Sequence, residues 1–327
     1  MHDVTQSLEA PVSLWRDAWG RLRGRRLARW SLAVIMGYAA LAVYGEAVYR
    51  FYRWRDRTPP YQAVVLEQAY LPPSFCRRPW TTPAAPGAPA WRASLQAARR
   101  LLQHPLGTDN LGRDVLQRII QGTRIAFLVG IITSCIAIPI GVFLGSLAGY
   151  FGGRVDDFIV WIYSTFASIP GLLFILAIAM VAGRGLAGVY LGIGLTTWVG
   201  LSRLIRGEVL KHKHRPYVLA AQALGMSDAR IMFRHILPNI FHVVIITFSL
   251  RFPAAISTEV FMSFLGIGVQ GEPSWGIMIS NARLRLWQGM WWELTFVTLA
   301  IFLIVLAFNL LGDALRDALD PRLRSAE

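Results

Sequence analysis

The chain has 327 residues, of which 54% are hydrophobic and 16% are charged, and its formal net charge is +14. This composition excludes a pair of ordinary soluble domains and favours a protein embedded in the lipid bilayer. The charge does not indicate nucleic-acid binding. Most of it is carried by arginines that flank apolar segments, and no stripe of basic and aromatic residues lies on a soluble module.

Six segments are apolar and long enough to cross a membrane as helices. A crossing needs about 20 residues, because every backbone amide must find its partner within the segment. The segments are 31–49, 125–150, 157–182, 185–202, 239–266 and 293–312. The fourth is the weakest, because it is rich in glycine. The sequence therefore predicts an all-α integral membrane protein with about six transmembrane helices.

Arginine and lysine set the predicted orientation. Residues 1–30 are rich in arginine, which places the N-terminus in the cytoplasm ahead of an uncleaved anchor helix at 31–49. Alternation of sides then puts residues 203–238 and the C-terminal segment 316–327 inside, and both are basic. The predicted outer loop, 50–124, is also rich in arginine, but loops of this length translocate with little regard to charge.

The predicted outer loop has two parts. Residues 57–91 are rich in proline and are expected to be irregular. Residues 107–114 form a turn with candidate caps and precede a short two-sided helix that begins at Val115. We expect that helix to lie along the membrane surface or against another subunit, or to lead into the next span. The residues singled out in the turn are Gly107, Asp109, Gly112, Arg113 and Asp114.

Small residues and prolines mark the second and third predicted spans. Gly141, Gly145 and Gly149 recur every four residues and would let another helix backbone approach closely. Pro139 and the pair at 170–171 are expected to kink their helices. Helix packing and the opening of a transport pathway are both consistent with these features.

Two charged residues fall inside the fifth predicted span. Arg251 and Glu259 are eight residues apart, a little over two helical turns, so they could neutralise one another only through a bridging group. Charged residues within spans are functional candidates by default. Contact with a peptide terminus in the pathway and a purely structural role both remain open.

Residues 207–238 are predicted to form a helix, turn and helix rather than a simple loop. One side of a first short helix is predicted to carry Tyr217, Ala220, Ala221 and Leu224, and Gly225 ends this helix by taking a left-handed conformation. Ser227 or Asp228 caps a second short helix that leads through His235 to Pro238. Such a hairpin could sit in a groove of a cytosolic protein or could merely join two spans.

The stretch from Tyr217 to Gly225, continued by His235 to Pro238, resembles the cytoplasmic coupling motif of binding-protein-dependent ABC importer permeases. The runs 104–114, 263–269, 273–276 and 310–322 are similar to the dipeptide and oligopeptide subfamily, and within it to the C-type member of a permease pair. The resemblance covers about residues 100–322. The family motif usually has glutamate before the paired alanines, where this chain has Leu219.

The resemblance implies the fold of a type I ABC importer permease in a bacterial inner membrane. It also implies a heterodimer with a second permease, two cytosolic ATPase subunits that use ATP and magnesium, and an external substrate-binding protein. The chain has no G-x-x-x-x-G-K-[ST] loop, so we expect it to be a transport subunit rather than an enzyme, with no cofactor or metal site of its own.

The implied substrates are dipeptides or oligopeptides, with nickel or another small solute as an alternative. A secondary transporter driven by an ion gradient is the alternative from another class. It would require buried acids in several spans, and Glu259 is the one clear case.

Overall fold

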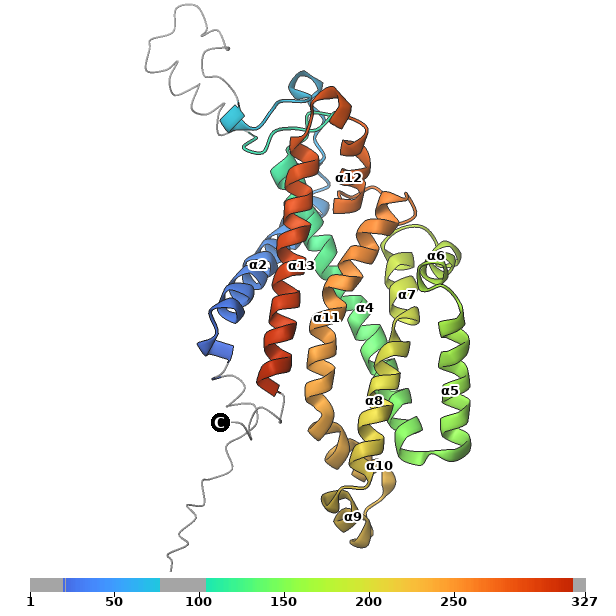
Figure 1. Ribbon diagram of the computed structural model, residues 1–327. Helices are drawn as coiled ribbons and strands as arrows, with labels where there is room; N and C mark the ends of the chain where they lie inside the picture. The colour runs from blue at the N-terminus through green and yellow to red at the C-terminus, as the bar shows by residue number, and fades with distance from the viewer. Residues whose placement is uncertain (1–19, 21, 77–103, 320–327) are drawn as a thin grey trace, which may run out of the picture.

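The computed structural model describes residues 20, 22–76 and 104–319, and helices dominate this part of the chain (Figure 1). Five helices are long and apolar enough to cross a membrane, and the number is six if one bent pair counts as a single span. The predicted all-α membrane fold is thus confirmed. Hydrogen bonding within each helix satisfies the backbone where no water is available.

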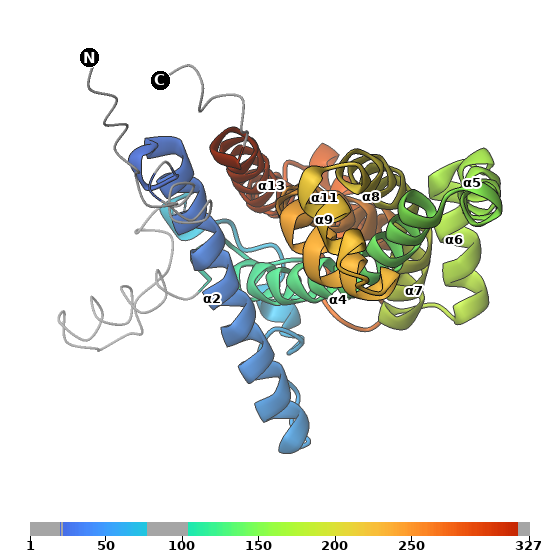
Figure 2. The ribbon, with the colours of Figure 1, turned by 90° about the horizontal axis from the view of Figure 1, so that it is seen from below.

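The first span, α2 (Arg26–Trp54), is longer at both ends than the predicted segment 31–49. It lies at one side of the bundle, opposite α5 and α6 (Figure 2). It packs against α4 (Val115–Phe151) and α13 (Trp292–Leu319). The hydroxyl of Tyr38 donates a hydrogen bond to the carbonyl of Ala300 at 2.9 Å, which fixes α2 against α13.

The second span, α4, has 37 residues and runs unbroken through Pro139. Of the alternatives predicted for the helix after Asp114, the lead-in to the next span is the one observed, because residues 115–124 are the first turns of the membrane helix. The first turns of α4 are largely buried, and Val115 and Ile125 are fully inaccessible to solvent. Residues 115–124 include polar side chains that suggested a surface location. Packing against the other spans stabilises these residues as part of the membrane helix instead.

Gly141, Gly145 and Gly149 of α4 face α8 (Trp198–Lys213), the helix with which α4 makes its most extensive contact. A Cβ atom added to Gly145 would lie 2.5 Å from the carbonyl oxygen of Ser202. The corresponding atoms on Gly141 and Gly149 would lie 3.0 and 2.7 Å from carbonyl oxygens of the same helix. The predicted close approach is confirmed, with α8 as the partner.

We expect Gly145→Val to destabilise the permease, because the added side chain must push α8 away. Overpacking of this kind costs about 1–3 kcal/mol. The melting temperature of the purified protein measures it. Gly37→Val in α2 is the matched control, since a Cβ there meets nothing within 4 Å. Equal melting temperatures for the two variants would contradict the packing.

The third predicted span, 157–182, is not a single helix. It consists of α5 (Gly153–Ser168) and α6 (Gly171–Ala182), which meet at an angle of 91°. The kink expected at Pro170 is confirmed and is a complete break. The 16 residues of α5 rise about 24 Å, less than the hydrocarbon thickness of about 30 Å, so neither helix crosses the membrane unaided.

The fourth and fifth spans are longer than predicted. α7 (Leu186–Thr196) and α8 together form one candidate span that ends at Lys213 rather than at Ser202. The fifth candidate span starts at Asp228 and ends at Phe264, the last residue of α11 (Leu237–Phe264). Residues 207–213 therefore belong to a membrane helix, and the hairpin proper is shorter than 207–238.

Short elements complete the end of the molecule opposite the hairpin. They are α12 (Trp275–Arg283) and the 3-10 turns η1 (Leu66–Gln68), η2 (Ser74–Cys76) and η4 (Leu286–Gln288). The proline-rich segment is described up to residue 76, where it contains η1 and η2 between irregular stretches. Its remainder, 77–91, lies outside the described residues.

Candidate functional site

The hairpin projects from one end of the bundle (Figure 1). It comprises α9 (Pro216–Ala223), a turn at Gly225, α10 (Asp228–Arg230) and a π-helical segment, η3 (Ile231–Ile236). Gly225 has φ +70°, the left-handed conformation that was predicted. A Cβ atom at this position would meet nothing within 4 Å. Backbone conformation, rather than lack of space, therefore requires glycine here.

The second half of the hairpin differs from the prediction. A separate short helix was expected up to Pro238, but α10, η3 and α11 follow one another without a break. Proline removes a backbone donor and crowds the preceding turn of an α-helix. The wider π-helical turn relieves this crowding, and the amide of Leu237 donates to the carbonyl of Met232 five residues earlier. The hairpin is thereby continuous with the fifth span.

The two alanines of the motif lie on different faces of α9. Ala221 is buried together with Val218, whereas Ala220 is exposed. Leu219 and Leu224 are also on the exposed side, with 50% and 76% of their surface accessible. The small-residue patch expected from the sequence is therefore divided. The surface offered to a partner consists of Leu219, Ala220 and Leu224, which we call the outer face of the hairpin.

The inner face of the hairpin is part of a buried apolar cluster with three membrane helices. Val218, Ala221, Ile231 and Ile236 come from the hairpin itself. Their buried neighbours in the cluster are Tyr150 of α4, Leu201, Ile205 and Val209 of α8, and Ile240 and Val244 of α11. Because a close-packed interior transmits displacement rather than absorbing it, movement of the hairpin must move these helices.

Polar contacts tie the same elements together. The hydroxyl of Tyr150 donates to Asp228 Oδ1 at 2.7 Å, linking α4 to the hairpin. The hydroxyl of Tyr217 lies 2.7 Å from Nδ1 of His212 at the end of α8. Burial raises the pKa of Tyr217, so the phenol keeps its proton and its hydrogen-bonding capacity. Ser227 precedes α10 but makes no capping hydrogen bond with its side chain.

The remaining predicted coupling residues lie further along the same chain segment. His235, in η3, is half-buried, and its carbonyl accepts a hydrogen bond from Asn239 Nδ2 at 2.7 Å. Sequence reasoning missed an ion pair elsewhere in the bundle: Arg206 of α8 donates two hydrogen bonds of 2.6 Å to Asp156 of α5. The two residues are 50 positions apart, so only the fold brings them together. This pair joins α5 to α8, one of the helices that pack against the hairpin.

The predicted external motif forms a turn at the opposite end of the bundle. Asp109 is buried and accepts hydrogen bonds from the amides of Leu111 and Arg113 at 2.9 Å each, and from Arg113 Nε at 2.7 Å. Gly107 and Gly112 both have positive φ. Asp114 caps α4 by accepting from the amide of Gln117 at 2.9 Å, as predicted.

This turn holds the loop before it and the start of α13. Thr108 exchanges hydrogen bonds with the backbone of Leu71. The carbonyl of Thr108 also accepts a hydrogen bond of 3.0 Å from Trp292 Nε1. Asp114 Oδ2 lies 2.7 Å from His104 Nδ1. The five residues of the predicted external motif therefore act in this chain as a structural clasp around the N-terminal end of α4.

Arg124 is the centre of an ionic cluster that the sequence did not reveal. Its guanidinium donates to Glu46 of α2 and to Glu272, which follows α11, at 2.7 Å each. It also lies 3.7 Å above the ring of Tyr49. The side chain of Arg124 is only 4% exposed. One arginine thus joins α2, α4 and the segment before α12.

We expect Arg124→Gln to destabilise the protein by about 3 kcal/mol, because it leaves Glu272 without its cation and Glu46 with only the exposed Arg50 in a poorly hydrated site. The melting temperature and the yield of the purified protein are the measurements. Arg50→Gln is the matched control: Arg50 also contacts Glu46, but its side chain is 78% exposed. Exposed pairs contribute about 0–1 kcal/mol. Equal losses in the two variants would show that burial of Arg124 is unimportant.

Arg251 and Glu259 do not interact. Arg251 donates to the backbone carbonyl and the hydroxyl of Thr197, between α7 and α8. Glu259 is 1% exposed and accepts a hydrogen bond of 2.6 Å from Ser263, whose hydroxyl also accepts from the amide of Val269. These contacts hold α11 to α7–α8 and to the turn that follows α11. They give both residues structural partners within this chain.

Two family models match this chain. Residues 141–325 match the family model described as the inner membrane component of binding-protein-dependent transport systems. Residues 13–73 match the N-terminal transmembrane domain of oligopeptide transport permease C. The first match covers the hairpin, α8, α11 and the last part of α4, and the second contains α2.

Three similar proteins illustrate the relationship. The dipeptide transport system permease protein DppC of Bacillus subtilis is 35% identical over 316 residues, which are 96% of this chain and 87% of that protein. The oligopeptide transport system permease protein OppC of the same organism is 33% identical and covers 98% and 94%. The glutathione transport system permease protein GsiD of Pectobacterium atrosepticum is 42% identical over 68% of this chain and 74% of that protein.

A solved structure has a similar fold. A chain of the MetNI methionine ABC transporter, crystallised in inward-facing conformations, aligns with a TM-score of 0.50 at 15% identity. The alignment covers 63% of this chain and 96% of that one. At this identity the likeness concerns the arrangement of the helices alone.

Proposed function

Because the chain belongs to the family of inner membrane components of binding-protein-dependent transport systems, we propose that it imports dipeptides or oligopeptides and that its hairpin docks on a cytosolic ATPase. The chain is a permease subunit of an ABC importer, and separate subunits hydrolyse ATP. A second permease completes the pathway, and an external binding protein delivers the substrate. ATP and magnesium are bound by the ATPase subunits.

One observation carries the docking proposal: the hairpin has an exposed outer face and an inner face packed into three membrane helices. An element that touches a partner on one side and the pathway helices on the other is suited to relay movement. Closure of the ATPases would displace α9, and the buried cluster would pass this displacement to α4, α8 and α11. The pathway would then switch between inward-facing and outward-facing arrangements.

The proposed orientation puts the hairpin and both chain termini in the cytoplasm. Arginine and lysine between residues 203 and 234 support it, because short basic flanks are retained on the cytoplasmic side. The structural clasp around Asp109 lies at the other end of the bundle (Figure 1) and would face the external binding protein. This arrangement places the substrate source and the ATPases on opposite sides.

Support for a peptide substrate comes from the names of the relatives, which are dipeptide, oligopeptide and glutathione transport permeases. Uptake of a radiolabelled dipeptide by the complete transporter in proteoliposomes tests the proposal. We expect uptake to require ATP on the side of the membrane that carries the ATPase subunits and to be inhibited by vanadate. Uptake should persist when a protonophore is added. Uptake by this chain alone, driven by an ion gradient, would contradict it. Competition by a nickel salt but by no peptide would contradict the substrate class.

A further inference from the structure

One arginine in the middle of a membrane helix has no counter-charge. Arg251 of α11 donates hydrogen bonds only to the carbonyl and the hydroxyl of Thr197, which are neutral groups. Its Nε is buried and has no hydrogen-bond partner. Among the residues that the structure describes, no acidic side chain forms an ion pair with it. Because arginine keeps its proton in proteins, Arg251 carries a charge that this chain does not balance.

The depth of Arg251 excludes a lipid head group as the missing anion. The helix α11 runs from Leu237 to Phe264, so Arg251 lies about 20 Å from either end of it. The phosphates of a bilayer lie outside a hydrocarbon core of about 30 Å. A charge at the centre of that core is costly unless it faces water or an anion. The anion must therefore come from the assembled transporter or from the transported molecule.

The face of α11 that carries Arg251 is open and partly polar. Four residues at intervals of three and four share this face: Thr247, Arg251, Ala254 and Thr258. None of them is buried in this chain, whereas the adjacent Phe252 is 2% exposed and packs into the bundle. Polar and charged groups within a membrane face the interior of an assembly or a water-filled cavity rather than lipid. This face therefore belongs to the side of α11 that meets the pathway.

Two breaks in neighbouring helices lie beside Arg251. The first is at Thr197, the residue between α7 and α8 to which Arg251 is bonded. The second is the elbow between α5 and α6. Phe166, just before this elbow, packs on Trp198 with the ring centroids 5.5 Å apart. Residues 167–173, which form the elbow, are all exposed. Irregular backbone at this depth is tolerated only where protein or a water-filled cavity covers it.

We propose that Arg251 binds the C-terminal carboxylate of a peptide as it crosses the membrane, while Thr197 holds the guanidinium in place. The site rests on the import of peptides proposed above. Peptides of different length and sequence share their backbone and their termini, so a carboxylate is a feature that one arginine can recognise in all of them. Guanidinium groups bind carboxylates through charged, often paired hydrogen bonds. Thr197 occupies only part of the five N–H groups of Arg251, so donors remain for a ligand.

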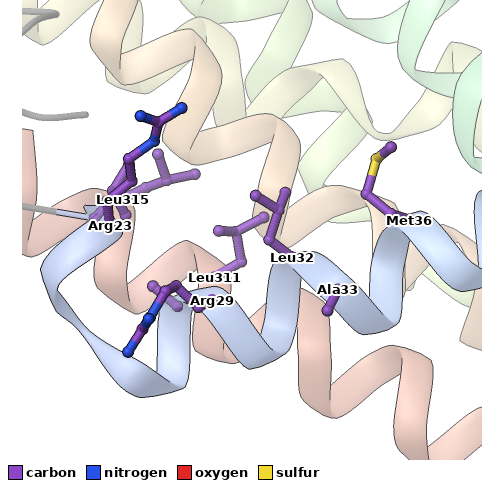
Figure 3. Close-up of a pocket in the computed structure, with 9 residues that line it drawn as sticks. Arg23, Arg29, Leu32, Ala33, Met36, Leu311 and Leu315 are labelled. Carbon is purple, nitrogen blue, oxygen red and sulfur yellow. The ribbon is translucent and has the colours of Figure 1, made fainter. Parts of the chain in front are cut away.

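A groove between the beginning of α2 and the end of α13 also combines arginines with apolar walls, and its volume is about 660 Å³. Figure 3 shows that Arg23 and Arg29 point to opposite sides there, so they do not converge on one anion. Both residues also lie near the beginning of α2 rather than in the middle of a span. The groove therefore does not offer a second carboxylate site.

Uptake of two peptides that differ only at the C-terminus tests the proposal. Radiolabelled dialanine and dialanine amide would be supplied to proteoliposomes that contain the assembled transporter. We expect the wild type to import the acid faster than the amide. Arg251→Gln should lower uptake of the acid at least ~10-fold and leave uptake of the amide nearly unchanged, which is the usual effect of losing a hydrogen bond to a charged group. A preference that arises in the external binding protein is the same for both permeases, so it cancels when the two ratios are compared.

Two further variants sharpen this comparison. Ala254→Glu leaves Arg251 in place but supplies a competing carboxylate one turn away, so it should also reduce the preference for the acid. Arg203→Gln in α8 is the matched control, because Arg203 lies over the ring of Tyr163 and not on the open face of α11. The control should keep the ratio of the wild type.

The proposal is overturned if the ratio of acid to amide uptake is unchanged in both Arg251→Gln and Ala254→Glu. A lower melting temperature of Arg251→Gln with an unchanged ratio would assign Arg251 to a carboxylate of the second permease or to helix packing alone. Equal uptake of acid and amide by the wild type would overturn this site and leave peptide import intact. Failure of the wild type to import either peptide would overturn the proposed function together with this site.

Discussion

Replacing Ala220 with arginine is expected to abolish ATP-driven uptake while the permease still folds and reaches the membrane. Ala220 lies on the outer face of the hairpin beside Leu219 and Leu224, and its side chain is exposed. A long charged side chain there would prevent α9 from entering a groove of the ATPase. Loss of a central contact weakens an interface by about 30-fold or more. Co-purification of the ATPase subunits and uptake by proteoliposomes are the measurements.

The neighbouring substitution Ala221→Arg is the matched comparison. Ala221 is 4% exposed and belongs to the buried cluster below the hairpin. An arginine there would bury a charge without a partner, so we expect less folded protein rather than a folded, uncoupled one. Normal uptake by the Ala220 variant would show that the ATPase binds elsewhere. A stable and active Ala221 variant would contradict the placement of α9.

The substitution Gly225→Pro is expected to uncouple ATP hydrolysis from uptake. Proline fixes φ near −65°, whereas Gly225 has φ +70°, so the turn between α9 and α10 cannot form as it does in the wild type. The hairpin would lose its shape while α8 and α11 keep theirs. We expect uptake to fall at least ~10-fold, with ATP consumed per molecule imported rising accordingly, because strain of about 1–3 kcal/mol opposes the native turn.

Gly225→Asn is the control for this experiment. Asparagine adopts the left-handed conformation more readily than other non-glycine residues, and a side chain at this position meets nothing within 4 Å. Most of the uptake should therefore remain. If the proline variant imports substrate as efficiently as the asparagine variant, the geometry of this turn has no part in coupling.

The hairpin was predictable because its signals are local. Helical spacing, a glycine that ends α9 and the basic flanks all lie within one stretch of sequence. Which face of α9 would be buried was not predictable, because it depends on Ile205 and Ile240 in two other helices. The continuity of α10 with α11 was missed for a different reason. Pro238 indicates the start of a helix, and a π-helical turn that accommodates it leaves no distinct pattern.

At the end of the bundle opposite the hairpin, only contacts between residues close in sequence could be predicted. Asp114 was identified as a cap from its position before an apolar helix, and the structure confirms that role. The partners of Arg124 lie 78 and 148 residues away along the chain, so no spacing rule connects them. The role of Arg251 depended in the same way on Thr197, which lies 54 residues away.

Leu219 marks a departure from the coupling motif of the family, which usually has glutamate here. The structure places this residue on the outer face, half exposed, next to the surface proposed to meet the ATPase. A carboxylate at this position would face the partner rather than the interior. In this chain the residue exposed at this position is apolar, and the exposed Leu224 adds to the apolar surface. The partner ATPase is therefore expected to present an apolar groove.

Disulfide cross-linking of the hairpin to an ATPase subunit tests the docking of α9 most directly. Cys76 and Cys135, which are both free and exposed, would first be replaced by serine. Leu224→Cys would then be paired with a cysteine in the ATPase groove of the assembled transporter. The account predicts a cross-link whose yield changes with bound nucleotide. Modification of the cysteine at residue 224 by a membrane-impermeant reagent added outside intact cells would contradict it.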